Sequence, residues 1–235
     1  MPSGRIILRG SAAAYVGPAL DLAPHRCAVA TIAAALEGAF DLAVFDAGGS
    51  PQPFLSVPAA VIAPGMRHHL VATGPMAFVY LDAASADWTA LAELEPAHLR
   101  ARVLDRLADP DPSAMLRLLD GPARRDPRVE YVLRLLDDDP DAVRAIQDAG
   151  LRVGLSPSRL QTLLRAQVGI PFRRYRLWRR MAQVLRFVRA GGSLTDAAHA
   201  AGFASSAHFS TAFRRMFGLA PSRLLTGAIA LDLDA

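Results

Sequence analysis

The feature that most constrains this chain is a helix, glycine, helix pattern in residues 193 to 225. Ser193 can cap a short helix of small apolar residues, which ends at Gly202, and Ser205 can cap a second helix. The second helix carries an apolar stripe at helical spacing: Phe209, Ala212, Phe213, Met216 and Phe217. The pattern predicts two helices joined by a tight turn, as in a helix-turn-helix, although helical domains without a DNA partner share this outline.

The same pattern occurs a second time, 49 positions earlier in the chain. Ser156 corresponds to Ser205, and Gly169 corresponds to Gly218, the residue that ends the apolar stripe. The positions between them also correspond: Leu160 with Phe209, Leu163 with Ala212, Leu164 with Phe213 and Arg165 with Arg214. Residues 141 to 153 are expected to form the bracing helix of this earlier unit. The chain therefore predicts two helix-turn-helix units.

One continuous helix is predicted between the two units, from residue 172 to residue 190, where Gly191 and Gly192 end it. At about 1.5 Å per residue it would be roughly 28 Å long. One turn of B-DNA is about 34 Å. A connector of this length can hold two recognition helices in successive major grooves on one face of the duplex.

Charge is divided unevenly between the two halves of the chain. Residues 141 to 225 contain 14 Arg and 3 acidic residues, a net charge of +11, whereas residues 1 to 140 contain 12 Arg and 17 acidic residues, a net charge of -5. Ten arginines and no carboxylate lie between Asp148 and Asp196. A solvated protein face normally mixes both signs, whereas a basic half joined to an acidic half is typical of a nucleic-acid-binding domain fused to a second domain.

Residues 141 to 225 resemble the DNA-binding domain of the AraC/XylS family of bacterial transcription regulators. The resemblance rests on GLSPSRL (154 to 160), on residues 169 to 175 and on AAGFASSAHFSTAFRRMFG (200 to 218). It implies sequence-specific binding of double-stranded DNA, transcription regulation as the function and RNA polymerase as a further partner. Leu224 and Leu225 stand where the family often has an aromatic residue and an arginine, a departure that concerns contacts at this end and not the fold.

Polar side chains between the apolar stripes are expected to project toward DNA, at positions that resemble the base-contacting positions of the family. Base contacts are predicted from Ser158, Gln161, Thr162, Ser206, Ala207, Ser210 and Thr211. Gln161 offers a bidentate contact to adenine, whereas Ala207 can touch only a thymine methyl group. Phosphate contacts, which fix register without reading sequence, are predicted from Arg159, Arg165, Arg173, Arg174, His208, Arg214 and Arg215. The alternative for each exposed arginine is simple solvation.

Short apolar runs separated by Gly and Pro fill residues 1 to 82, as is typical of a small antiparallel sandwich or barrel. Strands are expected at residues 6 to 8, 28 to 32, 40 to 45, 59 to 62, 69 to 72 and 77 to 81. The segment resembles a degenerate cupin through PHRC (24 to 27) and PGMRHH (64 to 69), which implies an amino-terminal sensor domain. The predicted fold class is two domains: an all-β cupin-like barrel with flanking helices, then an all-α double helix-turn-helix.

A cupin enzyme holds its metal with several histidines and a carboxylate. Here Cys27 follows His25 where a second histidine would be expected, Glu37 is distant, and His68 and His69 form the second candidate pair. An organic effector or a purely structural barrel is favoured over a metal, so no metal or cofactor is predicted and the effector pocket stays unassigned. No Ser-His-Asp, Walker or dinucleotide motif indicates catalysis.

Two alternative functions differ from a regulator. A metal-dependent cupin enzyme with a helical appendage would leave the repeat and the basic half unexplained. A general nucleoid-associated protein would bind DNA with no preferred site. A regulator is therefore favoured over an enzyme.

Residues 87 to 107 have a helical pattern that Pro96 is expected to divide or kink, and their apolar faces would either form a homodimer or pack on the barrel of the same chain. The predicted organisation is a cupin-like domain (1 to 108), a linker (109 to 127), a DNA-binding domain (128 to 226) and a tail (227 to 235). The lone Cys27 excludes an intrachain disulfide. With no secretory signal or membrane span in the sequence, a cytoplasmic protein is expected.

Overall fold

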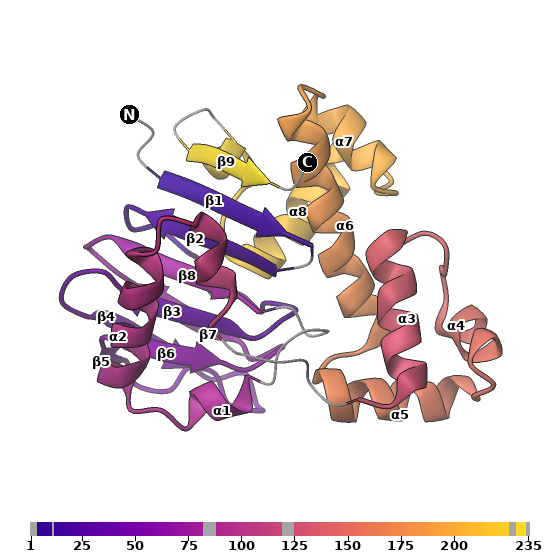
Figure 1. Cartoon of the computed structure of the whole chain (residues 1–235), viewed down its shortest axis with the longest axis horizontal. Helices are drawn as coiled ribbons and strands as arrows, with labels where there is room; N and C mark the ends of the chain where they lie inside the picture. The colour runs from indigo at the N-terminus through magenta and orange to yellow at the C-terminus, as the bar shows by residue number, and fades with distance from the viewer. Residues whose placement is uncertain (1–3, 11, 82–87, 119–124, 226–228, 234–235) are drawn as a thin grey trace.

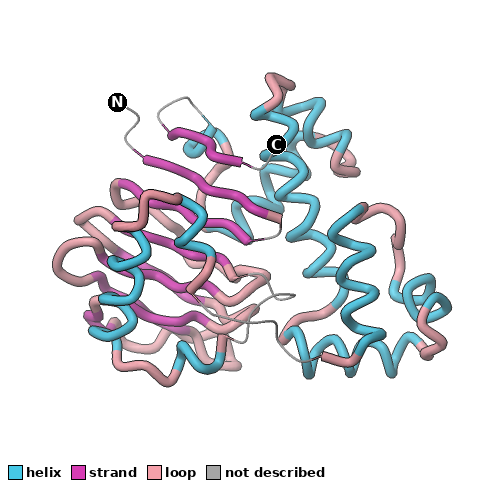
Figure 2. The backbone as a smooth tube through the Cα atoms, viewed as in Figure 1, coloured by secondary structure: helices cyan, strands magenta, loops and turns pink. Residues whose placement is uncertain are grey.

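The computed structural model describes residues 4–10, 12–81, 88–118, 125–225 and 229–233. A β-rich part and a helical part lie side by side (Figure 1), and Figure 2 shows that strands are concentrated in the first and helices in the second. The β-rich part contains β1 (Gly4–Arg9), β2 (Ala12–Gly17), β3 (Thr31–Ala35), β4 (Phe40–Val44), β5 (Leu55–Val57), β6 (Ala59–Ile62), β7 (His68–Val71) and β8 (Met76–Tyr80). The predicted order of a β-rich domain followed by a helical domain is confirmed.

The strands form two sheets, with six strands in the order β6-β3-β8-β2-β1-β9 and three in the order β5-β4-β7. Among the described residues the sheets do not close into a barrel, so the cupin-like barrel of the prediction is not confirmed. Strand β9 (Ile229–Leu233) pairs in parallel with β1, and Gly4 is the partner of Ile229. The segment predicted as a tail therefore extends the larger sheet at its edge.

Both faces of the six-stranded sheet are covered. On β1, Ile6 and Leu8 belong to the core between the sheet, the smaller sheet and the helical domain, whereas Ile7 belongs to a second core on the opposite face. Two helices cover that opposite face, α1 (Thr89–Ala92) and α2 (Pro96–Leu107). The proline of α2 stands in its first turn, which confirms the predicted division. Because the buried residues of α2 pack on its own sheet, their pattern requires no partner chain.

Several strands and the linker differ from the prediction. Strand β3 begins three residues later than expected because all of its residues are buried, so no alternation marks its ends. The sequence pattern does not indicate β2, whose alanines have little strand propensity, or the three-residue β5. The segment predicted as a linker contains the 3-10 helix η1 (Pro112–Leu116), and its Met115 is buried in the second core. Residues 119 to 124 of that linker lie outside the described residues.

The helical domain contains α3 (Pro127–Asp138), α4 (Ile146–Arg152), α5 (Pro157–Val168), α6 (Phe172–Arg189), α7 (Leu194–Ala200), α8 (Ser206–Phe217) and α9 (Ser222–Leu225). The connecting helix is confirmed as α6, and the two recognition helices are confirmed as α5 and α8. The bracing helix of the first unit was predicted too long, because Asp139 accepts the Asp141 backbone N–H in a turn and Ala145 is extended. Helix α4 therefore begins only at Ile146.

The two domains share one continuous core. Tyr80 of β8 lies between Trp178 of α6 and Phe217 of α8, with ring centroids 5.8 Å and 5.6 Å away. The same core runs from the six-stranded sheet through α6 and α8 to the rest of the helical domain. Helices α6 and α8 thus cover the part of the sheet that the smaller sheet leaves open.

Candidate nucleic-acid interface

The two recognition helices begin and end in the same way. The Ser156 hydroxyl accepts the Arg159 backbone N–H at 3.3 Å, and the Ser205 hydroxyl accepts the His208 backbone N–H at 3.1 Å. Each helix has 12 residues and ends at a glycine with positive φ, 81° at Gly169 and 79° at Gly218. The 49-residue repeat predicted from the sequence is therefore a repeat of structure.

In the second unit, α7 is the bracing helix that packs against the start of α8. Asp196 donates its backbone N–H to the Ser193 hydroxyl at 3.1 Å, and that hydroxyl donates to the Asp196 carboxylate at 2.6 Å. The turn contains Gly202 with φ of 73°. Phe203 then packs on Phe209 of α8, with ring centroids 5.3 Å apart. These contacts fix the start of α8 against α7.

In the first unit the structure exposes most of the predicted DNA-contacting residues. Ser158, Arg159, Thr162 and Arg165 are exposed, and the Thr162 hydroxyl donates to the Ser158 carbonyl at 3.0 Å. Gln161 is only half exposed, and its amide nitrogen is buried without a hydrogen-bond partner among the described residues. Gln161 therefore differs from the expected outward position, since its amide must rotate before it can donate to a base.

In the second unit Ala207, Thr211, Arg214 and Arg215 are exposed on α8. Ser206 and Ser210 are half-buried, so they present less of their side chains than the sequence pattern indicates. His208 is exposed at the start of the helix, where its Nδ1 accepts the Ala204 backbone N–H at 3.4 Å. The exposed face of α8 thus carries small side chains near its start and two arginines toward its end.

The arginines of α6 divide into structural and exposed ones. Arg179 is 3% exposed and is paired with Asp137 at 2.8 Å. Arg176 and Arg180 both bind the Asp141 carboxylate. Burial by itself would raise the pKa of Asp141, but the hydrogen bonds and charges of Arg180 and Arg176 outweigh it and hold this pKa below its ordinary value.

The predicted phosphate ligands of α6 lie outside this ion-pair network. Arg173 is exposed and Arg174 is half exposed, and neither makes an ion pair within the described part of the chain. The structure therefore leaves both residues available to an anion. The acidic residues before the connecting helix are the sequence signal that could have separated the two classes of arginine.

The amino-terminal domain contacts the second recognition helix, which the sequence pattern does not indicate. The Ala23 backbone N–H donates to the Gly218 carbonyl at 2.9 Å, and the Arg26 backbone N–H donates to the Arg215 carbonyl at 3.2 Å. No local pattern marks these residues, because main-chain hydrogen bonds between distant segments leave no signature in side-chain periodicity. The loop after β2 therefore lies against the end of α8.

The candidate metal ligands His25 and His68 lie side by side in the core. Their rings are in contact, with centroids 4.2 Å apart, and their Nδ1 atoms lie 3.0 Å and 3.1 Å from the carbonyls of Ala23 and Met66. Burial and then the neighbouring charge of His68 lower the pKa of His25 to about 3, and burial also lowers the pKa of His68. Two buried rings that each bond a main-chain carbonyl pack as neutral side chains.

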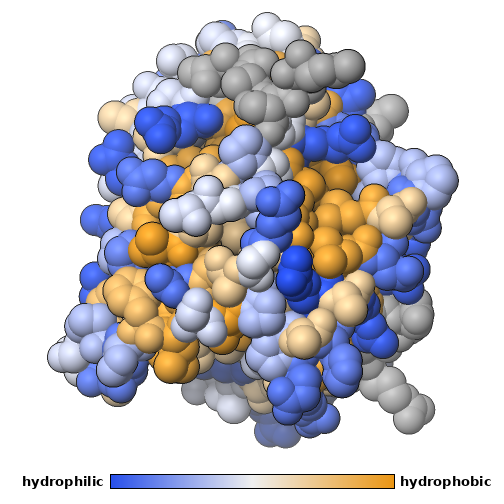
Figure 3. All heavy atoms as spheres, turned by 90° about the vertical axis from the view of Figure 1, so that its left-hand side faces the viewer, coloured by the Kyte–Doolittle hydropathy of each residue, from blue (hydrophilic) through white to orange (hydrophobic). Residues whose placement is uncertain are grey.

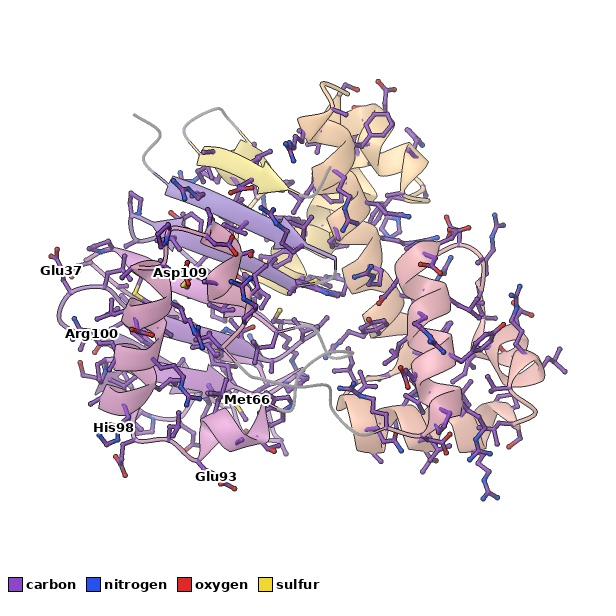
Figure 4. The ribbon with its side chains drawn as sticks, viewed as in Figure 1. Glu37, Met66, Glu93, His98, Arg100 and Asp109 are labelled. Atoms are coloured by element: carbon purple, nitrogen blue, oxygen red, sulfur yellow. The ribbon has the colours of Figure 1, made fainter. Side chains whose placement is uncertain are left out.

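The other predicted members of a metal site do not complete one. Cys27 is fully buried, which raises the pKa of its thiol, and Glu37 is exposed at the outer edge of the β-rich domain (Figure 4). Within the described part of the chain, no three or more His, Cys, Asp or Glu side chains are grouped to hold a metal. The residues present therefore do not fit the metal site of a cupin enzyme. Among the described residues, no helix is both long and apolar enough to span a bilayer.

Comparisons with known proteins agree with this geometry. Residues 151–227 match the helix-turn-helix domain family. The HTH-type transcriptional activator RhaS of Citrobacter koseri is 32% identical over 115 residues, which cover 48% of this chain and 41% of that protein. RhaS of Escherichia fergusonii is 35% identical over 114 residues. The chain thus spans about two fifths of the length of these relatives.

A solved structure extends the likeness to both domains. The apo form of a single-residue variant of ToxT from Vibrio cholerae has a TM-score of 0.60, 13% identity, and coverage of 94% of this chain and 98% of that one. Unsaturated fatty acid bound wild-type ToxT has a TM-score of 0.56, 13% identity, and coverage of 97% and 95%. At this identity the likeness shows a common fold. Residues 151–227 thus belong to the helix-turn-helix domain family and are similar to the HTH-type transcriptional activator RhaS, and the paired helix-turn-helix units lie behind a β-rich domain as in the fold of ToxT.

Proposed function

We propose that this protein is a sequence-specific DNA-binding transcription regulator. The observation that carries the proposal is the pair of recognition helices with identical caps, held by one connecting helix in a domain with a net charge of +11. Small exposed side chains at the helix starts can approach base edges, and the arginines around them can neutralise phosphates. The match to the transcriptional activator RhaS supports this activity.

We assign base contacts and phosphate contacts to the residues predicted from the sequence. The seven base-contacting residues stay Ser158, Gln161, Thr162, Ser206, Ala207, Ser210 and Thr211. Thr162 and Thr211 are the most openly presented hydroxyls near the middle of each helix, and Gln161 requires a rotation. The seven phosphate ligands stay Arg159, Arg165, Arg173, Arg174, His208, Arg214 and Arg215.

We propose that the β-rich domain responds to a small effector. ToxT is known with an unsaturated fatty acid bound, which supports a ligand-binding role for this kind of fold. Here the apolar cavity between the six-stranded sheet and helices α6 and α8 holds only about 50 Å³. Ligand pockets measure about 300 to 1,000 Å³. An effector of ordinary size could enter this cavity only if the two domains move apart, so its binding would act directly on α8.

Further parts of the proposal concern organisation and partners. The domain limits stay as predicted at residues 1 to 108 and 128 to 226, with the addition that β9 returns to the first domain. A homodimer and a contact with RNA polymerase also stay predictions.

Figure 3 shows apolar patches among polar side chains on the side of the β-rich domain away from the helical domain, and Phe54 and Leu55 are 50% and 67% exposed. These two side chains are our candidates for a dimer contact, which analytical ultracentrifugation tests.

Selection of binding sites from random DNA tests the central proposal. The full chain should enrich one sequence with two half-sites about one helical turn apart, because two recognition helices are joined by one connector. A shift assay on the selected site should show affinity that falls steeply with salt and exceeds the affinity for random DNA. Enrichment of no sequence would support the nucleoid-associated alternative instead.

A further inference from the structure

A cleft of about 490 Å³ lies where α8, the first half of α6 and two loops of the β-rich domain meet. Seven of the residues that line it are arginines, and none is acidic. Two of them, Arg176 and Arg180, share the single carboxylate of Asp141. The other five make no ion pair among the residues that the structure describes: Arg26, Arg67, Arg173, Arg174 and Arg215. Five uncompensated positive charges around one hollow create a strong positive potential that favours an anion.

Two of these five arginines, Arg26 and Arg67, come from loops of the amino-terminal domain. The Arg26 main chain is hydrogen-bonded to the Arg215 carbonyl of α8 at 3.2 Å. The Arg67 guanidinium lies over the Phe45 ring, 4.1 Å from its centroid. The loops that carry Arg26 and Arg67 are joined by two backbone hydrogen bonds of 3.0 Å between His25 and His68. The Arg67 guanidinium and the main chain that carries Arg26 are therefore fixed before an anion arrives.

The surroundings of the cleft favour a DNA backbone over a small anion. Its wall includes His208 and Thr211, which lie on the exposed face of the recognition helix. A second hollow of about 360 Å³ shares Pro24, Thr211 and Arg215 with the first and also reaches Arg214. Pockets for small ligands are mostly apolar and enclose most of their ligand. An open cleft rimmed by arginines along a groove-reading helix instead matches the phosphates that flank that groove.

We propose that Arg26 and Arg67 contact phosphates of the same DNA that α8 reads, so that the amino-terminal domain forms part of the DNA interface. This inference rests on the proposed function and adds a partner for residues outside the helix-turn-helix domain. It also means that a change in the position of the β-rich domain alters DNA affinity through direct contacts, without any change in the recognition helices.

The test compares charge removal inside and outside the cleft in the full chain. Arg26→Gln and Arg67→Gln should each weaken binding to the selected DNA about fivefold at 0.15 M salt, and each should reduce the log-log salt slope by about 1. Arg102→Gln is the matched control, because Arg102 is an exposed arginine on α2, which covers the opposite face of the sheet. It removes the same charge from the same domain and should leave the slope unchanged. Arg67→Lys should keep most of the affinity, which separates loss of charge from loss of packing on Phe45.

Three results would overturn the inference. The cleft variants could behave as Arg102→Gln does, or they could bind DNA more tightly than the wild type, which would mean that the Pro24 loop hinders α8. Calorimetry with pyrophosphate could also show binding that Arg26→Gln abolishes while DNA affinity stays unchanged, which would assign the cleft to a small anion. Arg214→Gln separates these failures from failure of the proposed function. If Arg214→Gln lowers the slope and the cleft variants do not, only the present inference fails, whereas no effect of any of them contradicts both.

Discussion

Gly169 and Gly218 lie 49 positions apart, end the two recognition helices in the same left-handed conformation, and each meet a loop of the amino-terminal domain. A Cβ atom at Gly169 would lie 3.3 Å from Pro64, and one at Gly218 would lie 2.6 Å from the Ala23 carbonyl oxygen. Backbone hydrogen bonds join the two loops to each other. The amino-terminal domain therefore contacts both reading helices at equivalent points, where it can influence their relative orientation.

The contact at Gly218 predicts an unusually large cost for adding one methyl group. Gly218→Ala should destabilise the protein by about 3 kcal/mol or more, because a left-handed alanine costs about 1 to 2 kcal/mol and the main-chain clash adds to it. Gly154→Ala is the control, since Gly154 has φ of 65° and an added methyl group there would meet nothing within 4 Å. In urea unfolding, Gly154→Ala should lower the free energy of unfolding only by the cost of a left-handed alanine, about 1 to 2 kcal/mol. Equal costs for the two changes would mean that the Ala23 loop does not press on α8.

The continuous core predicts that both domains unfold together. Trp88, the residue before α1, packs against the second core, and Trp178 lies at the contact with Tyr80, so each tryptophan reports on a different domain. Trp178→Phe leaves fluorescence from the first part, and Trp88→Phe leaves fluorescence from the second. The two variants should each unfold in one transition whose midpoint agrees with that of their own circular dichroism at 222 nm. A fluorescence transition displaced from the circular dichroism transition in either variant would show that the domains are independent.

The shared core also predicts that truncation of the Trp178 side chain lowers the free energy of unfolding by a large amount. Trp178→Ala should cost about 3 to 5 kcal/mol in urea unfolding, because Trp178 is 3% exposed and contacts rings from both domains. Phe187→Ala is the control on the same helix, since Phe187 is 39% exposed. Its cost should stay near 1 kcal/mol or below. A small cost for both changes would contradict a packed interface between the domains.

The buried histidine pair predicts that stability falls with acidity. His25 has a pKa of about 3 in the folded protein against an ordinary value of 6.5, because of burial and the charge of His68. Between these two values the unfolded chain binds a proton that the folded chain does not, so the free energy of unfolding decreases as pH falls from about 6.5 toward 3. His25→Gln should make this decrease shallower in urea unfolding at a series of pH values. His98→Gln, a change at an exposed position on α2, is the control, and the idea fails if both variants retain the wild-type dependence.

Substitutions on the two recognition helices should weaken DNA binding in two different ways. Gln161→Ala should cost about 1 to 3 kcal/mol on the selected site and nothing on a site changed at the base pair that it reads. Arg214→Ala should weaken binding to all sequences and reduce the salt slope by about 1, because a phosphate contact carries no sequence information. Shift assays on selected and random DNA over a range of salt measure both effects. Equal losses on specific and random DNA for both variants would contradict the two roles.

The helical domain could be predicted well because its signals are local. A serine cap, an apolar stripe and a terminal glycine all act within about four residues, so α5 and α8 begin and end where their sequences indicate. Prediction failed where a longer-range contact competes. Asp141 lies in a turn before α4 and binds two arginines of α6, and Gln161 is partly covered by its neighbours in the folded chain.

The sequence by itself determined the two repeated helix-turn-helix units, the connecting helix between them and the separation of basic from acidic halves. Only the tertiary structure decided that β9 pairs with β1 across the whole length of the chain, that α6 and α8 complete the core of the β-rich domain, and that Arg26 and Arg67 face the second recognition helix. The physical reason is that caps and periodicity are encoded by neighbours in sequence. Strand pairing and domain packing join residues that are far apart in sequence, and no local pattern of side chains records which of them will meet.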